Sequence, residues 1–158
     1  MIIVLLLLKA LYLSMTTNRT KDFDHAEHNY KLHTQLLADG NFDDWAITTG
    51  FYSGIKFLQN ALFPSEYICP SEQKMKLFRT FAEYIRANRS LNQANAHRIL
   101  ANIVESYIEE DEVKNSYKDL KDACHFARYI NYNVGKERLS LAKEALEVIK
   151  DFHDKTKT

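Results

Sequence analysis

The segment that decides the fold is YKDLKDACHFARYINYNV, residues 117 to 134. Apolar side chains recur in it and just before it at spacings of four, three, four and three residues, at Val113, Tyr117, Leu120, Cys124 and Ala127. At about 100° per residue these positions stack on one face of an α-helix. The segment therefore predicts a long amphipathic helix with one buried stripe, which Gly135 ends.

Two polar residues fall on or beside this apolar stripe. On a helical wheel Asn131 lies inside the stripe, and Arg128 lies about 80° from Leu120, at its border. A guanidinium in that position must reach solvent or find a partner, because an unpaired buried charge is costly. Arg128 is therefore the first candidate for a functional residue.

Length and composition predict a single domain. The chain has 158 residues, of which 46% are hydrophobic and 27% charged, so it can bury a core that needs neither disulfides nor a metal. The 21 basic and 21 acidic side chains give a formal net charge of zero. No overall field therefore attracts DNA or RNA, and any RNA binding must be local or shared with a partner.

The two cysteines, Cys69 and Cys124, are not arranged as a CxxC pair. Cys124 lies on the apolar stripe and is expected to be a small buried side chain. This use of cysteine favours a reduced, cytoplasmic location.

The first residues, MIIVLLLLKALYLSM, differ from the rest of the chain. The apolar run is shorter than the about 20 residues that span a membrane, so we expect no membrane span. Three interpretations stay open: a signal peptide that lacks the usual basic start, an extension upstream of a start at Met15, or a helix that packs on the domain or on a partner. We divide the chain into an apolar extension (1–15), a helical domain (16–154) and a frayed tail (155–158).

Glycine and proline are scarce, and no alternating pattern indicates a strand, so the sequence predicts an all-α antiparallel bundle of five to six helices. A rigid turn segment, PSEYICP, is expected at residues 64–70. The helices are expected from near Asp22 to Gly40, from Asn41 or Asp43 to Pro64, from Ser71 to RANRSLNQ, from about Asn92 to Ile108, from the acidic residues 109–112 to Gly135, and from Lys136 to about Asp154.

The second of these helices is apolar over much of its circumference and is expected to be the central buried one. It contains a ridge of small residues at near-helical spacing: Ala46, Gly50, Ser53 or Gly54, and Ala61. Glycine in a helix interior costs about 1 kcal/mol against alanine, so the ridge predicts close approach of another backbone. Room for a ligand is the alternative interpretation.

Sequence motifs for nucleotide, zinc-protease and serine-hydrolase sites are absent: there is no GxGxxG, P-loop, HExxH or GxSxG. His25 and His28 are spaced like metal ligands after Asp22, and His33 follows on the same predicted helix. No Glu-x-x-His pair occurs on another helix. We therefore predict no metal and no cofactor.

His97 falls on the apolar face expected for the fourth helix, and Arg98 follows it. One interpretation is a core histidine that is hydrogen-bonded to a neighbour. The other is a site shared with Arg128 across two packed helices, with the imidazole as general base or acid and the guanidinium on a phosphate. In both cases the fourth and fifth helices should contact each other.

Two segments, DDWAITTGFYSGIKFLQNAL and YKDLKDACHFARYINYNV, resemble the HEPN superfamily of prokaryotic helical domains over about residues 22–153. The first has an aromatic residue, small residues and FYSG, and the second has the triplet ARY late in a long helix. The resemblance implies a four- or five-helix bundle that forms a homodimer or joins a larger complex. It also implies a role in antiviral defence, toxin–antitoxin or RNA-processing systems.

Active members of this superfamily are metal-independent endoribonucleases with an Arg that is followed after four to six residues by a His. Arg128 matches the Arg, but the residues at the position of the His are Asn133, Val134 and Gly135. The candidate catalytic residues are Arg128, His97 and Asn133. The candidate RNA- or ligand-binding residues are Arg98, Tyr129, Asn131, Tyr132 and His125.

Two functions stay open at this point. One is an endoribonuclease whose general base is His97 or His125, with Arg128 and Asn133 on the phosphate. The other is a non-catalytic module that dimerises and binds RNA, a protein partner or a small ligand through the same cleft.

Overall fold

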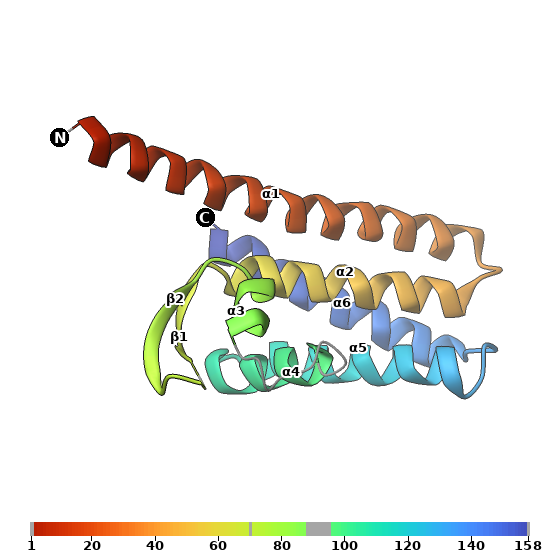
Figure 1. The fold of residues 1–158 in the computed structure, drawn as a ribbon. Coiled ribbons are helices and arrows are strands. Elements are labelled where there is room, and N and C mark those ends of the chain that lie inside the picture. The colour runs from red at the N-terminus through yellow and green to blue at the C-terminus, as the bar shows by residue number, and fades with distance from the viewer. Residues whose placement is uncertain (1, 70, 88–95, 158) are drawn as a thin grey trace.

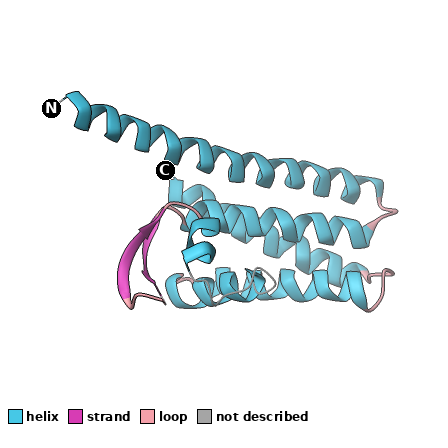
Figure 2. Cartoon of the chain, in the orientation of Figure 1, coloured by secondary structure: helices cyan, strands magenta, loops and turns pink. Residues whose placement is uncertain are grey.

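The computed structural model describes the backbone of residues 2–69, 71–87 and 96–157, and the side chains of 21–69, 71–87 and 96–156. Within these ranges it confirms the all-α prediction, with six helices and one small hairpin (Figures 1 and 2). The elements are α1 (Ile2–Asp39), α2 (Asp43–Leu62), β1 (Ser65–Cys69), β2 (Lys74–Phe78), α3 (Phe81–Ala87), α4 (Ala96–Tyr107), α5 (Asp111–Tyr129) and α6 (Lys136–Lys157).

Helix α2 lies at the centre of the bundle, as its sequence predicts. It contacts α1, α5 and α6, and α5 and α6 also contact each other (Figure 1). Large apolar side chains of α2, including Ile47, Phe57 and Leu58, are fully buried. Because α2 is covered on three sides, it positions the helices that carry the candidate site.

Helix α1 is continuous from Ile2, whereas the sequence pattern predicts that the first helix starts near Asp22. Residues 2–39 contain no glycine or proline, so nothing in this stretch ends a helix. The apolar extension is thus joined to the domain by unbroken helix. At the other end Gly40 ends α1 as predicted, with φ +73° and a hydrogen bond from its N–H to the Leu36 carbonyl (3.1 Å).

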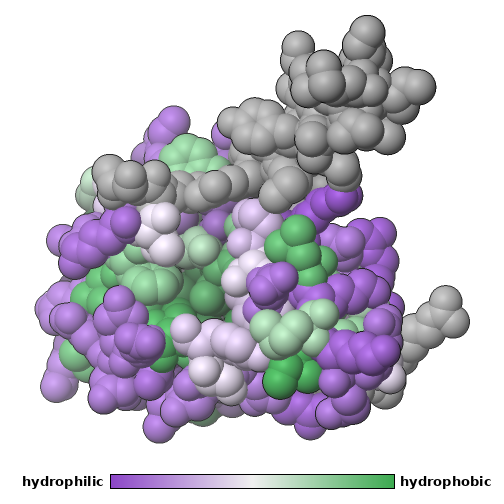
Figure 3. Space-filling model, turned by 90° about the vertical axis from the view of Figure 1, so that its left-hand side faces the viewer, coloured by the Kyte–Doolittle hydropathy of each residue, from purple (hydrophilic) through white to green (hydrophobic). Residues whose placement is uncertain are grey.

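The expected turn and the start of the expected third helix instead form an antiparallel hairpin, β1–β2, in which Ile68 is paired with Met75. In β1, Tyr67 and Cys69 are buried and their neighbours are exposed, the period of two that a strand requires. The prediction of a helix from Ser71 was therefore wrong. Figure 3 looks onto the hairpin end of the molecule, where green apolar atoms lie between purple hydrophilic ones.

Both side chains and the backbone of α1 approach the small-residue ridge of α2, and Ser53 Oγ donates to the Ala26 carbonyl at 2.8 Å. A Cβ added at Gly50 would lie 2.9 Å from His33 Nδ1, and one added at Gly54 would lie 3.0 Å from Leu120 Cδ2. The ridge therefore accommodates two side chains from α1 and α5. The space that was an alternative ligand site is filled by them.

The apolar stripe of α5 is confirmed, because all five of its predicted members are buried. The helix ends at Tyr129, however, and does not continue to Gly135. Asn131 is consequently exposed in the following turn, and its predicted place inside the stripe was wrong.

The fourth and the sixth expected helices are also present. Helix α4 begins at Ala96 among the described residues, and the predicted start at Asn92 lies outside them. Helix α6 begins at Lys136 as predicted and includes residues 155–157 of the expected tail. In the part of the chain that the structure describes, no helix is both long and apolar enough to cross a bilayer.

Candidate functional site

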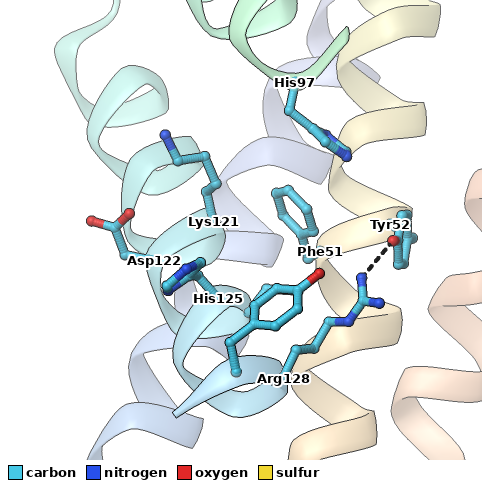
Figure 4. Close-up of a pocket in the computed structure, with 9 residues that line it drawn as sticks. Phe51, Tyr52, His97, Lys121, Asp122, His125 and Arg128 are labelled. Carbon is cyan, nitrogen blue, oxygen red and sulfur yellow. Dashed lines mark hydrogen bonds between the residues drawn. The ribbon is translucent and has the colours of Figure 1, made fainter. Parts of the chain in front are cut away.

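A cavity of about 430 Å³ lies beside α2, α4 and α5, and it is the surface feature to which Arg128 belongs (Figure 4). Its walls combine aromatic rings, two imidazoles, two cations and one carboxylate. The lining residues are Phe51, Tyr52, His97, Lys121, Asp122, Cys124, His125, Arg128 and Tyr129.

Arg128 is exposed in the last turn of α5, at the border of the apolar stripe. Its Nη1 donates a hydrogen bond to the Tyr52 hydroxyl at 2.9 Å, and its guanidinium carbon lies 5.3 Å from the centroid of the Tyr129 ring (Figure 4). The interaction with Tyr52, followed by that with Tyr129, raises the pKa of Arg128. The guanidinium thus has a partner, which is the phenol of Tyr52 on α2.

His97 is exposed, so its predicted burial on the apolar face of α4 was wrong. The buried face of α4 consists of Ile99, Leu100, Ile103 and Val104, and His97 lies at the border of that face, one turn before Leu100. The His97 ring lies 5.6 Å from the Phe51 ring, centroid to centroid, in the same cavity as Arg128. Its backbone carbonyl accepts a hydrogen bond from the Tyr117 hydroxyl (3.3 Å), which confirms that α4 and α5 contact each other.

His125 is the second imidazole of the cavity. It is exposed on α5 one turn before Arg128, and its ring centroid lies 5.2 Å from that of Tyr129. Lys121 and Asp122 occupy the preceding turn of the same helix. The cavity therefore presents two imidazoles, a side-chain type that can donate or accept a hydrogen bond, next to two cationic side chains.

The Cys124 thiol belongs to the cavity lining but is almost completely buried. Burial raises the pKa of Cys124, so the group remains a neutral thiol at physiological pH. A thiol in that state is a poor nucleophile. The imidazoles are thus the better candidates for proton transfer and Arg128 for binding an anion.

Four sequence-predicted residues are not brought to this cavity. Arg98 lines a different cavity of about 380 Å³, with Tyr84 and Tyr107. Asn131, Tyr132 and Asn133 are exposed in the turn after α5, where the backbone N–H of Asn133 donates to Asn131 Oδ1 (2.9 Å). They leave the cavity because α5 ends at Tyr129.

Sequence reasoning missed Phe51, Tyr52, Lys121 and Asp122. Phe51 and Tyr52 lie in the FYSG segment, which carried the family resemblance but was given no role. Lys121 and Asp122 lie one turn before His125 on the same helix, and that spacing alone could have identified them.

The histidines of α1 do not converge on a common point. His25 and His28 are exposed, whereas His33 is buried and its Nδ1–H donates to the Ala46 carbonyl at 2.7 Å. Among the described side chains, no three from His, Cys, Asp or Glu are grouped so that they could hold a metal ion.

No family model, no curated protein and no solved structure matches this chain.

Proposed function

We propose that this chain is a HEPN-like helical domain that binds RNA in the Arg128 cavity and cleaves it without a metal ion. The observation that carries the proposal is the arrangement around Arg128. Tyr52 fixes its guanidinium at 2.9 Å, and two imidazoles, of His97 and His125, line the same cavity. The resemblance of residues 43–62 and 117–134 to the superfamily supports the same function.

The character of the walls favours single-stranded RNA. Tyr52 and Tyr129, which are 38% and 68% exposed, offer ring faces on which an unpaired base can stack. Arg128 uses one N–H for Tyr52, which leaves further donors for a phosphate. Stacking supplies attraction that does not depend on net charge, which fits a protein whose formal net charge is zero.

Cleavage would use the two imidazoles as base and acid. In the proposed step, neutral His97 removes the proton from a ribose 2′-hydroxyl, and the 2′-oxygen forms a bond to the adjacent phosphorus. The bond from phosphorus to the 5′-oxygen breaks, and protonated His125 delivers a proton to that oxygen. Arg128 stabilises the charge that develops on the phosphate. The products are a 2′,3′-cyclic phosphate and a 5′-hydroxyl.

A non-catalytic binding domain is the second candidate function. It is favoured by the sequence after Arg128, where Asn133 replaces the expected histidine, and by the position of Asn133 outside the cavity lining. In that case the same cavity holds RNA, a protein segment or a small ligand without cleaving anything.

For the cellular setting we propose a cytoplasmic defence or toxin–antitoxin system in which the chain acts as a homodimer or with a partner protein. Induced expression in bacteria would then arrest growth, and Arg128→Ala would relieve the arrest. Normal growth with the unchanged protein at high expression would contradict a toxin role.

The experiment that tests the catalytic proposal is incubation of the purified protein with total RNA in the presence of EDTA. Cleavage should occur, and it should be lost in Arg128→Ala and in His97→Ala. Arg98→Ala is the matched control, because this neighbouring arginine lines a different cavity. If the unchanged protein binds RNA and leaves it intact, the non-catalytic function replaces the proposed one.

A further inference from the structure

A second cavity, of about 380 Å³, lies between α3 and α4, and we call it the Arg98 cavity. Helix α4 contributes to both cavities: His97 lines the Arg128 cavity, and its neighbour Arg98 lines this one. The two cavities have no lining residue in common. Sites that enclose small molecules have volumes of about 300–1,000 Å³, so the Arg98 cavity is large enough for a small ligand.

Two neighbouring rows of side chains on α4 form one wall of the Arg98 cavity. The members of each row recur every four residues, so each row follows one face of the helix. The polar row consists of Arg98, Asn102 and Ser106, and the apolar row consists of Ile99, Ile103 and Tyr107. At 1.5 Å per residue each row is about 12 Å long. A ligand that lies along α4 therefore meets polar groups on one edge and apolar groups on the other.

The polar row is exposed and available to a ligand. Within the part of the chain that the structure describes, the side chains of Arg98, Asn102 and Ser106 make no hydrogen bond and no ion pair. Among the described residues that line the cavity, Arg98 is the only charged one. Its guanidinium offers five N–H donors in a planar fork, and a carboxylate accepts two of them side by side. The polar row is therefore suited to a ligand with one negative charge.

The apolar side of the cavity is held in place by the aromatic cluster beneath it. Ile99 and Ile103 are buried, whereas Tyr107 is 46% exposed. The ring of buried Tyr67 packs against both phenols of the cavity, with centroid distances of 4.6 Å to Tyr107 and 5.6 Å to Tyr84 of α3. Burial raises the pKa of Tyr84, so this phenol stays neutral at physiological pH. The apolar side thus offers a fixed, uncharged surface on which a flat ring can pack.

We propose that the Arg98 cavity binds a small aromatic carboxylic acid, with its carboxylate on Arg98 and its ring against Ile103 and Tyr107. One carboxylate neutralises the single charge of the cavity, whereas a phosphate monoester carries a charge of about −1.5 to −2 at pH 7 and would leave part of it unpaired. Asn102 and Ser106 hydrogen-bond to a polar substituent of the ligand. This site is independent of the function proposed for the Arg128 cavity.

Titration of the isotope-labelled full chain with 4-hydroxycinnamate, followed by amide NMR spectra, tests this site. The probe has a carboxylate at one end, a ring, and a hydroxyl at the other end. It should shift the amide signals of residues 98–107 and bind at one site per chain. The uncharged analogue 4-hydroxycinnamamide should bind at least tenfold more weakly. Guanosine 5′-monophosphate represents the competing phosphate chemistry, and tighter binding of this nucleotide in the Arg98 cavity would overturn the proposal.

Substitutions locate the bound probe, and the same spectra show that each variant is folded. Arg98→Ala should weaken binding of 4-hydroxycinnamate at least tenfold, and Asn102→Leu should weaken it about threefold. Arg86→Ala is the control, because this exposed arginine of α3 lines a different cavity of about 530 Å³, and it should leave the affinity unchanged. Undetectable binding at millimolar concentrations of the probe would overturn the proposal. Binding that Arg128→Ala abolishes and Arg98→Ala leaves intact would also overturn it.

Discussion

The Arg128 guanidinium is held by the Tyr52 hydroxyl through a hydrogen bond of 2.9 Å that joins the last turn of α5 to the middle of α2. The two residues are 76 positions apart in the sequence. Both side chains are exposed, so the bond contributes little to stability. Its effect is to direct the guanidinium along the wall of the cavity, which is what a preorganised anion site requires.

Tyr52→Phe should weaken RNA binding while leaving the fold unchanged. The substitution keeps the ring and removes the hydroxyl that orients Arg128, so the loss of affinity should be about threefold to tenfold. It should be smaller than the loss for Arg128→Ala, which removes the charge itself. Fluorescence anisotropy with a labelled single-stranded RNA measures this difference. Equal affinity of Tyr52→Phe and the unchanged chain would show that the bond has no orienting role.

Gly50→Ala should destabilise the bundle by about 1–3 kcal/mol. The added Cβ would lie 2.9 Å from His33 Nδ1, a ring that is itself held by the Ala46 carbonyl and cannot easily move. Urea unfolding followed by circular dichroism measures the change. Gly135→Ala is the matched control, because nothing lies within 4 Å of a Cβ added there. Equal stability of the two variants would contradict the close contact.

The stability of the bundle should fall in mild acid because of His33. The pKa of His33 is lowered, mainly because the side chain is buried. The hydrogen bond to the Ala46 carbonyl and the charge of Glu147 act in the opposite direction, whereas the charge of Lys143 lowers the pKa further. The unfolded chain therefore binds more protons than the folded chain just below the ordinary value of 6.5. Stability from this group is complete above about pH 6.5 and decreases as the pH falls toward the folded pKa, by at most about 1.4 kcal/mol per unit.

Urea unfolding at a series of pH values from 8 to 5 measures this dependence. His33→Gln, which can still donate to the Ala46 carbonyl, should flatten the profile. His25→Gln, at an exposed position of the same helix, is the control and should leave the profile unchanged. A profile of the same slope in His33→Gln would assign the acid sensitivity to other groups.

Tyr67→Phe should cost about 1–2 kcal/mol of folding free energy. The Tyr67 hydroxyl donates to the Leu62 carbonyl at 2.7 Å in a buried position, so its loss leaves a carbonyl at the end of α2 without that partner. Tyr132→Phe, at a tyrosine that is 79% exposed, should change nothing and serves as the control. Thermal unfolding of the two variants makes the comparison, and matching midpoints would mean that the hairpin is not anchored through this bond.

The fold was predictable where one helix face is buried and the other is solvated. In α5 every predicted apolar position is buried. Apolar residues that recur with the helical period of 3.6 residues lie on one face, and that face packs against the bundle. The hairpin was missed because only Tyr67 and Cys69 in β1, and Phe78 in β2, point inward. The other positions of the two strands are exposed, and they include charged as well as apolar residues. Such short strands show too little alternation to be recognised.

Only the part of the site that lies on one helix, α5, was predictable from the sequence. Periodicity placed Arg128 at the border of the stripe, where it lies, but gave no indication that its partner would come from α2. Asn133 was selected because it stands where the family resemblance places a histidine after Arg128. Helix α5 ends at Tyr129, and in the turn that follows Asn131 Oδ1 accepts a hydrogen bond from the Asn133 backbone N–H, a local bond that competes with continued helix and that the apolar period does not report.

The central claim is that Arg128 forms part of an RNA-binding cavity, and titration of a labelled single-stranded RNA with the full chain in EDTA tests it most directly. The account predicts measurable binding that Arg128→Ala weakens at least tenfold, while Arg98→Ala leaves the affinity unchanged. Undetectable binding by the unchanged chain, or equal affinity of the unchanged chain and Arg128→Ala, would contradict it.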